Sequence, residues 1–222
     1  MLLSIFYSAG SSRIFWIIRH CRPALLFRNA TAVVPAAAEN LALAAALATV
    51  GRMKLPPYPL IEPDLGAPLD IHRATVLPDW IDWNGHMNVG FYVVAFDKAT
   101  DTLCAQFGCS WDYTREKLGM TFVLEAHVTY DREVKEGDPL RITTQILDHD
   151  AKRIHFIHEM FHATEGYLAA TNELMLMNID YQTRRSAPWP EFAMPRIEKL
   201  AAAHAHLPRP QQAGRLIGIK RK

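Results

Sequence analysis

Cysteine is scarce in this 222-residue sequence, which contains only Cys21, Cys104 and Cys109 and no CxxC pair. An odd number of cysteines without that spacing argues against a disulfide scaffold and favours a reduced, intracellular setting. No run of about 18 uncharged apolar residues is present, so the sequence predicts no membrane-spanning segment. The formal net charge is only +1, and no excess of either sign predicts a nucleic-acid partner or a strongly acidic one.

Acidic residues are nearly absent from residues 1–52, which carry five arginines and a single glutamate. This composition is typical of an organelle-targeting peptide. It also fits an extension that precedes a true start at Met53, or a short folded element, and the sequence leaves these alternatives open. Residues 53–70 contain five prolines, which fix φ and remove backbone donors, so this range is predicted to be an extended lead-in.

An orderly pattern begins at residue 71 and continues to residue 187. The sequence first predicts a short strand over 71–77 and a loop over 78–88. A helix is then expected from Gly90 to about Gln106, with Asn88 as its N-cap. Apolar residues cover most of the circumference of this helix, which indicates that it is buried.

Four strand-like segments follow the helix, over residues 121–134, 139–149, 153–164 and 167–181. The breaks between them are short, which favours antiparallel neighbours joined by hairpins. Residues 188–222 are expected to form a C-terminal helix and a basic tail. This order predicts an α+β fold in which a curved antiparallel sheet wraps around a central buried helix. The free edge of such a sheet favours pairing in a dimer.

The stretch "DWIDWNGHMN", residues 79–88, places acids, amides, an imidazole and two indoles directly before the predicted helix. Asp82, Asn84 and His86 lie two apart, and side chains at that spacing point the same way in an extended loop. An acid, an amide and an imidazole would then converge on one pocket. The alternative is a capping loop in which Asp82 and Asn84 satisfy turn amides.

The start of the predicted helix offers unpaired N–H groups at Val89, Gly90 and Phe91. Helix N-termini attract negative charge, including the oxyanion that develops during acyl transfer. The glycines Gly85 and Gly90 would let a ligand approach the backbone closely. The loop and the helix start together form the candidate functional site.

The stretch "HEMFH", residues 158–162, matches the HExxH signature of zinc metallopeptidases. That motif requires a helix, on which His158 and His162 would share a face. On a strand the two histidines lie about 13 Å apart and cannot bind one zinc ion. Alternating apolar residues and short flanking breaks favour a strand here, although periodicity alone also permits a helix. No metal site is therefore predicted.

The stretch "IDWNGHMNVGFYVVAFDKATD" resembles the signature of hotdog-fold acyl-CoA thioesterases of the 4-hydroxybenzoyl-CoA thioesterase type. Its Asp-x-Asn-x-His-x-Asn pattern is also similar to that of plant acyl-ACP thioesterases. Four elements, "DWNGHMN", "LEAHVTY", "HDAKRIH" and "RSAPWP", resemble the betainyl-CoA thioesterase branch associated with carnitine degradation. The resemblance covers roughly residues 70–190 and implies a hotdog fold with a hydrolytic site in the loop before the helix.

Carried over to this sequence, the resemblance implies that Asp82 acts as general base for water or as nucleophile toward the thioester carbon. Asn84 and His86 would orient the water or Asp82. The backbone amides of Gly90 and Phe91 would form the oxyanion hole.

The resemblance also implies roles for residues outside the loop. In hotdog dimers the second strand faces the partner's helix start, so Glu125 would complete the site across the interface, or is a solvated strand carboxylate. His127 shares its face of the strand and is expected to line the substrate pocket. An aromatic cage would suit the quaternary ammonium of a betainyl group through cation–π attraction, although the same rings also suit plain packing. The candidate aromatic residues are Trp80, Trp83, Tyr92, Trp111 and Tyr113, of which Tyr92 is expected to pack.

Coenzyme A carries phosphates, which cations at the rim of a pocket would bind. The candidates are Arg132, Lys152 and Arg153, with Lys135 as a further option, although exposed hairpin charges are often only solvated. No metal or bound cofactor is expected, since the coenzyme A thioester is itself the substrate. Neither a nucleic-acid nor a membrane partner is expected.

These features predict a cytoplasmic acyl-CoA thioesterase that hydrolyses a short acyl-CoA, with betainyl-CoA as a candidate, to the free acid and coenzyme A. A homodimer or a dimer of dimers is expected. A genuine targeting peptide in residues 1–52 would instead place the protein in an organelle. A non-catalytic acyl-CoA-binding hotdog protein and a hotdog dehydratase are the alternatives, and the Asp-x-Asn-x-His arrangement argues against the dehydratase.

Overall fold

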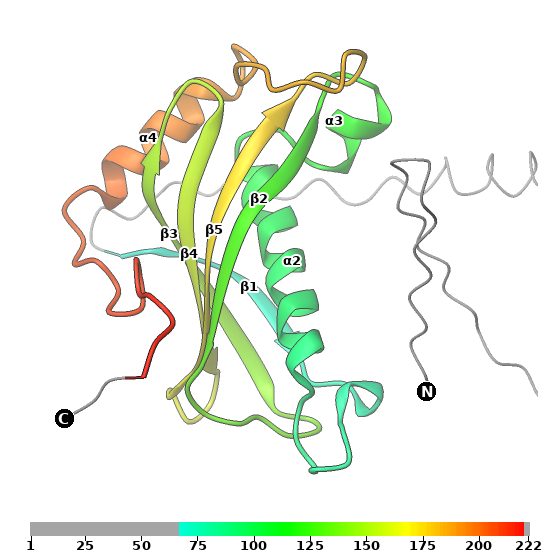
Figure 1. Cartoon of the computed structure of the whole chain (residues 1–222), viewed down its shortest axis with the longest axis vertical. Coiled ribbons are helices and arrows are strands. Elements are labelled where there is room, and N and C mark those ends of the chain that lie inside the picture. The colour runs from blue at the N-terminus through cyan, green and yellow to red at the C-terminus, as the bar shows by residue number, and fades with distance from the viewer. Residues whose placement is uncertain (1–66, 220–222) are drawn as a thin grey trace, which may run out of the picture. The chain divides into compact units, whose positions relative to one another are not determined.

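The computed structural model describes residues 67–219, so the predictions made for residues 1–52 and for most of the proline-rich lead-in over 53–70 lie outside the described residues. A curved five-stranded antiparallel sheet lies against the long helix α2, with strand order β1-β3-β4-β5-β2 (Figure 1). The strands are β1 (Leu69–Thr75), β2 (Met120–Tyr130), β3 (Pro139–His149), β4 (Arg153–His162) and β5 (Leu168–Ile179). The helices are the 3-10 turn η1 (Pro78–Trp80), α2 (Val89–Gln106), α3 (Trp111–Arg115) and α4 (Met194–His204). The predicted α+β architecture is confirmed.

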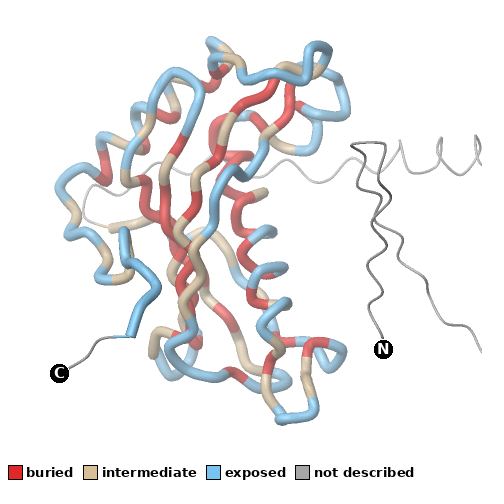
Figure 2. Tube along the Cα trace, in the orientation of Figure 1, coloured by how far each residue is buried: buried red, intermediate tan, exposed pale blue. Residues whose placement is uncertain are grey.

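The core lies between α2 and the sheet, where Figure 2 shows most of the buried chain. Ile154, Phe156, His158 and Met160 alternate along β4 and are all fully buried. Burying an apolar side chain of this size contributes about 1.5–3 kcal/mol relative to leaving it exposed. The alternation in the sequence therefore reflects a strand, and the helical interpretation of the "HEMFH" stretch is wrong.

Helix α2 begins at the predicted N-cap, where the Gly90 N–H donates to Asn88 Oδ1 at 3.0 Å. The sheet covers only one side of its first half. On the other side Val89, Val93 and Val94 remain 40–59% exposed. Residues 67–219 therefore do not supply all the cover that the apolar circumference of this helix predicted.

Strand β2 forms one edge of the sheet, and within residues 67–219 its one partner strand is β5. Residues Phe122 to Ala126 are all exposed, and because neighbouring side chains on a strand point to opposite faces, both faces of this part of β2 are open. Figure 2 shows the edge strand in the colour of exposed residues. Phe122, Val123 and Leu124 are each more than 40% exposed. Unpaired edges with exposed apolar side chains are sites where a further strand can add.

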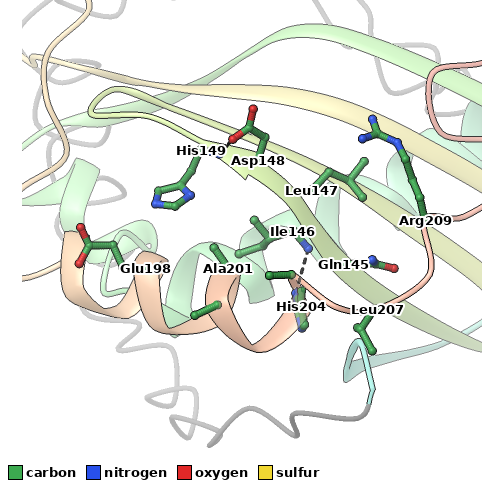
Figure 3. A pocket seen from close by; sticks show the side chains of 12 residues that line it. Gln145, Ile146, Leu147, Asp148, His149, Glu198, Ala201, His204, Leu207 and Arg209 are labelled. Atoms are coloured by element: carbon green, nitrogen blue, oxygen red, sulfur yellow. Dashed lines mark hydrogen bonds between the residues drawn. The ribbon is translucent and has the colours of Figure 1, made fainter.

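The other edge of the sheet is closed by two elements. Strand β1 pairs with β3 only from Pro139 to Thr144. Beyond it, the Ile146 N–H donates to Nδ1 of His204, the last residue of α4, at 2.9 Å (Figure 3). The imidazole thus takes the place of a strand carbonyl, and α4 protects the part of the β3 edge that β1 leaves open.

Helix α3 was not predicted from the sequence. Its Tyr113 is buried, and the hydroxyl donates to Asn178 Oδ1 on β5 at 2.9 Å. The ring lies so close to Gly119 that any Cβ there would collide with the hydroxyl and the ring. Within residues 67–219, no helix combines the length and the apolar character needed to cross a bilayer.

Candidate active site

The segment from Ile81 to Met87 folds as a tight turn before α2. Ile81 and Met87 form a β-bridge, and the Asp82 N–H donates to the His86 carbonyl at 3.1 Å. Gly85 has a φ of +82°, a conformation that favours glycine. The segment is therefore not extended, and the expectation that alternation alone aligns Asp82, Asn84 and His86 is wrong.

Asp82 and Asn84 nevertheless meet at the base of this turn. The half-buried Asp82 carboxylate accepts the Asn84 backbone N–H at 2.8 Å and lies 3.4 Å from its side-chain amide. This is the geometry of the alternative interpretation, in which Asp82 satisfies turn amides. The two roles are compatible, because a carboxylate has further lone pairs with which to accept a proton from water.

His86 lies beside the loop between β2 and β3. Its Nε2 is 4.0 Å from the Glu133 carboxylate, which also lies 3.4 Å from Lys135 Nζ. The Met87 N–H donates to the Val134 carbonyl at 2.9 Å. Glu133 was not identified from the sequence, since the pairing depends on how the two loops dock.

The backbone N–H groups at the start of α2 differ in whether they already have a hydrogen-bond acceptor. The Gly90 N–H donates to Asn88 Oδ1, and the Phe91 N–H donates to the Asn88 carbonyl at 2.9 Å. The two amides predicted for the oxyanion hole therefore already have acceptors. Among residues 67–219 the structure shows no acceptor for the Val89 N–H, which makes this amide the open donor at the positive end of the helix.

The aromatic residues around the turn have different environments. Trp80 is buried and stacks on Phe91 with ring centroids 5.7 Å apart. Trp83 at the tip of the turn is 99% exposed. Tyr92 is buried and packs edge-on against Tyr130, and burial raises its pKa. Tyr92 thus packs as expected, while Trp83 is the ring open to a ligand.

Trp111 and Tyr113 lie on α3, at the opposite end of α2 from the turn (Figure 1). The Trp111 indole donates to Asp101 Oδ2 at 3.4 Å. Within one chain these rings cannot form a cage with Trp80 and Trp83.

Glu125 and His127 lie on the exposed edge strand β2, where a bulge separates Val123 from Glu125. Their role across a dimer interface stays a prediction, because it requires a second chain.

The cations proposed for coenzyme A are divided between the two ends of the sheet. Arg132 lies in the loop after β2 and its guanidinium covers the Tyr167 ring at 3.9 Å. Lys152 and Arg153 lie at the turn between β3 and β4, the end remote from the start of α2 (Figure 1). Arg153 donates to Asp150 at 2.6 Å and holds the pKa of that carboxyl down to about 2. In one chain, Arg132 and Lys135 of the β2–β3 loop lie at the same end of the sheet as the turn, and Lys152 and Arg153 do not.

Known proteins resemble this chain over the same region. A family model described as the thioesterase-like superfamily matches residues 76–197. The chain is 40% identical to the betainyl-CoA thioesterase of Pseudomonas aeruginosa over 152 residues, which cover 68% of this chain and 95% of that protein. It is 34% identical to the L-carnitine dehydrogenase/betainyl-CoA thioesterase of Rhizobium meliloti, covering 71% of this chain and 32% of that longer protein.

A solved structure shows the same fold. The Staphylococcus aureus protein solved in complex with CoA superposes with a TM-score of 0.64 at 32% identity, covering 70% of this chain and 99% of that one. The prediction of a hotdog-fold acyl-CoA thioesterase is confirmed, and the chain belongs to the thioesterase-like superfamily.

Proposed function

We propose that the protein hydrolyses betainyl-CoA or another short acyl-CoA at the turn before α2, with Asp82 as the catalytic carboxylate. The observation that carries this assignment is the half-buried Asp82 carboxylate in a turn that leads directly into the start of α2. Identity of 40% over nearly the whole betainyl-CoA thioesterase of Pseudomonas aeruginosa supports the choice of acyl group.

The chemistry follows from these groups. Asp82 takes a proton from water, and the water oxygen attacks the thioester carbon to give a tetrahedral oxyanion. The Val89 N–H and the positive end of α2 stabilise this oxyanion. Collapse of the intermediate expels the coenzyme A thiolate, which takes up the proton held by Asp82 and so restores the carboxylate. Asn84 holds Asp82 in place, and His86 with Glu133 borders the site.

The active unit in this proposal is a homodimer in the cytoplasm. The exposed β2 edge and the exposed valines of α2 support it, since both are apolar surfaces that a second chain would cover. In such a dimer, Glu125 of the partner subunit would complete the first chain's site. Light scattering on the purified protein tests the dimer, and a monomer at micromolar concentration contradicts it.

The activity is tested by thiol release from acetyl-, betainyl-, aromatic and long-chain acyl-CoA, comparing the wild-type protein with Asp82→Asn. This change keeps an oxygen that can accept the Asn84 N–H, so the turn should persist while the base is lost. We expect kcat to fall by at least about 100-fold. Asp79→Asn, the same change at an exposed residue three positions earlier, is the matched control and should retain activity.

Two outcomes contradict the proposal. An active Asp82→Asn protein would remove Asp82 from the chemistry. Binding of acyl-CoA without thiol release from any thioester would favour a non-catalytic acyl-CoA-binding protein.

A further inference from the structure

Helix α2 carries two buried threonines that face the sheet. The Thr100 hydroxyl donates to the Phe96 carbonyl at 3.1 Å, and the Thr102 hydroxyl donates to the Lys98 carbonyl at 3.0 Å. A hydroxyl has one proton, so each of these oxygens can then only accept a further hydrogen bond.

A histidine of β4 supplies the donor for Thr100. His158 Nε2 lies 3.0 Å from Thr100 Oγ1, and because the threonine proton is already used, Nε2 carries the hydrogen. His158 Nδ1 lies 2.8 Å from Thr144 Oγ1 on β3, so the Thr144 hydroxyl donates to it. Complete burial lowers the pKa of His158 to about 3, which keeps the imidazole neutral.

The imidazole of His158 is also fixed by its neighbours. It stacks on Phe96 of α2 with an interplanar angle of 8° and a centroid distance of 5.9 Å. Phe156 packs edge-on against it at 5.0 Å. Hydrogen bonds thus connect Thr144 on β3, His158 on β4 and Thr100 on α2, and Thr100 passes the chain on to the Phe96 carbonyl. This chain holds one turn of the helix against the sheet.

A second histidine repeats the arrangement from β1. His72 Nδ1 lies 3.0 Å from Thr102 Oγ1, whose proton is also used within the helix, so Nδ1 is the donor. His72 Nε2 is then the bare nitrogen, and it is buried without a partner among the described residues. We call the pairs His158–Thr100 and His72–Thr102 the two histidine–threonine tethers.

The tethers are not the arrangement that stability alone favours. Apolar side chains of similar shape in place of a buried hydrogen-bonded group are often neutral or stabilising. Apolar contacts are non-directional, however, whereas hydrogen bonds require a definite distance and angle. A slip of one residue moves a helix by about 1.5 Å along its axis and turns it by about 100°.

The position of α2 matters because its first turn belongs to the site. The turn before α2 is held by the loop after β2, through the Met87 N–H and the Val134 carbonyl. The start of α2 at Val89 lies about 16.5 Å along the axis from Thr100. Any shift of α2 against the sheet therefore moves the Val89 amide relative to Asp82.

Building on the proposed function, we propose that His158 and Thr100, together with His72 and Thr102, are positioning residues that fix α2 relative to the catalytic carboxylate. This gives a role to the first histidine of the "HEMFH" stretch, which carries no metal function in a strand.

The test compares stability with turnover in variants of the full chain. Thr100→Val leaves the His158 Nε2–H without an acceptor and should lower both the thermal stability and kcat. The triple variant Thr100→Val, Thr144→Val, His158→Leu removes all three polar groups and should regain thermal stability. We expect its kcat to stay at least about 10-fold low with KM nearly unchanged, because displacements of about 1 Å are costly to catalysis. A triple variant with wild-type stability and wild-type kcat overturns the proposal.

Two variants serve as controls. Thr100→Ser keeps the hydroxyl and should have the kcat of the wild-type protein. Thr143→Val makes the same change at the residue beside Thr144, where the buried hydroxyl has no partner among the described residues, and should leave kcat unchanged. Loss of kcat in Thr143→Val equal to that in Thr100→Val overturns the proposal.

Amide hydrogen exchange separates this inference from the proposed function, because it needs no turnover. Thr100→Val should increase exchange at the amides of Gly90 and Phe91, and Thr143→Val should not. If the wild-type protein cleaves no thioester, the proposed function fails, while this measurement still tests the His158–Thr100 tether. Unchanged exchange in Thr100→Val shows that the tether does not fix the helix start and overturns it.

Discussion

Acidification should weaken the contact by which α4 closes the sheet. His204 is 2% exposed, and its Nδ1 accepts the Ile146 N–H, so this nitrogen must be unprotonated (Figure 3). Burial first, and then the nearby His206, lower the pKa of His204 to about 4. The charged residues that line the adjacent cavity are Asp148, Glu198 and Arg209.

The sign and size of the effect follow from proton linkage. An unfolded histidine has a pKa of about 6.5, so between about pH 4 and 6.5 the unfolded chain binds a proton that folded His204 does not. The contribution to stability is therefore fully present above about pH 6.5 and is lost as the pH falls toward 4. Between pH 7 and pH 5 the loss from this one residue is about 2 kcal/mol.

Urea unfolding at pH 7 and pH 5 measures this loss in the wild-type protein and in His204→Asn. The asparagine offers an oxygen acceptor near the position of Nδ1 and does not titrate. We expect the free energy of unfolding of the wild-type protein to fall by about 2 kcal/mol more than that of the variant. His158 titrates in both proteins and cancels in the comparison. An equal pH dependence in the two proteins would refute the reasoning.

Three further changes test the fold and the site. Gly119→Ala forces a Cβ into Tyr113, and overpacking plus a lost hydrogen bond should destabilise the folded protein by about 2–4 kcal/mol in thermal melts. The control Gly218→Ala places its Cβ in open space and should melt like the wild type. Asn88→Ala removes the cap of α2 and should cost about 1 kcal/mol in urea unfolding, and a cost near zero contradicts the cap. Trp83→Ala should change stability by less than about 0.5 kcal/mol but raise KM, and an unchanged KM removes Trp83 from substrate binding.

The strands and the long helix were predictable because their signals are local. Alternation set the faces of β4, and the short breaks gave the β3–β4 and β4–β5 hairpins. The hairpin expected across the first break is wrong, because β2 pairs with β5 at the edge of the sheet and not with β3. Asn88 was recognisable as a cap because it precedes an apolar helical run, and the structure has α2 starting at the next residue. Helix α3 spans only Trp111–Arg115, which is too short for periodicity to reveal it.

The candidate site was predictable in composition but not in geometry. The positive φ of Gly85 bends the segment into a turn, and alternation across such a turn says nothing about shared direction. The separation of Lys152 and Arg153 from the start of α2 depends on which end of the sheet each hairpin occupies. The pairing of Thr100 with His158, 58 residues apart, arises only when the helix packs on the sheet.

The position of β2 at the edge has a consequence for synthesis of the chain. In the described part of the chain its one partner is β5, and the pairs run from Tyr130 with Ala170 to Met120 with Ile179. At about 5–20 residues per second, β2 waits several seconds on the ribosome before β5 is made. Throughout that time its apolar side chains and both of its backbone edges are unprotected. A ribosome that stalls between the two strands leaves a nascent chain prone to aggregation, so the yield of folded protein depends on uninterrupted translation through β5.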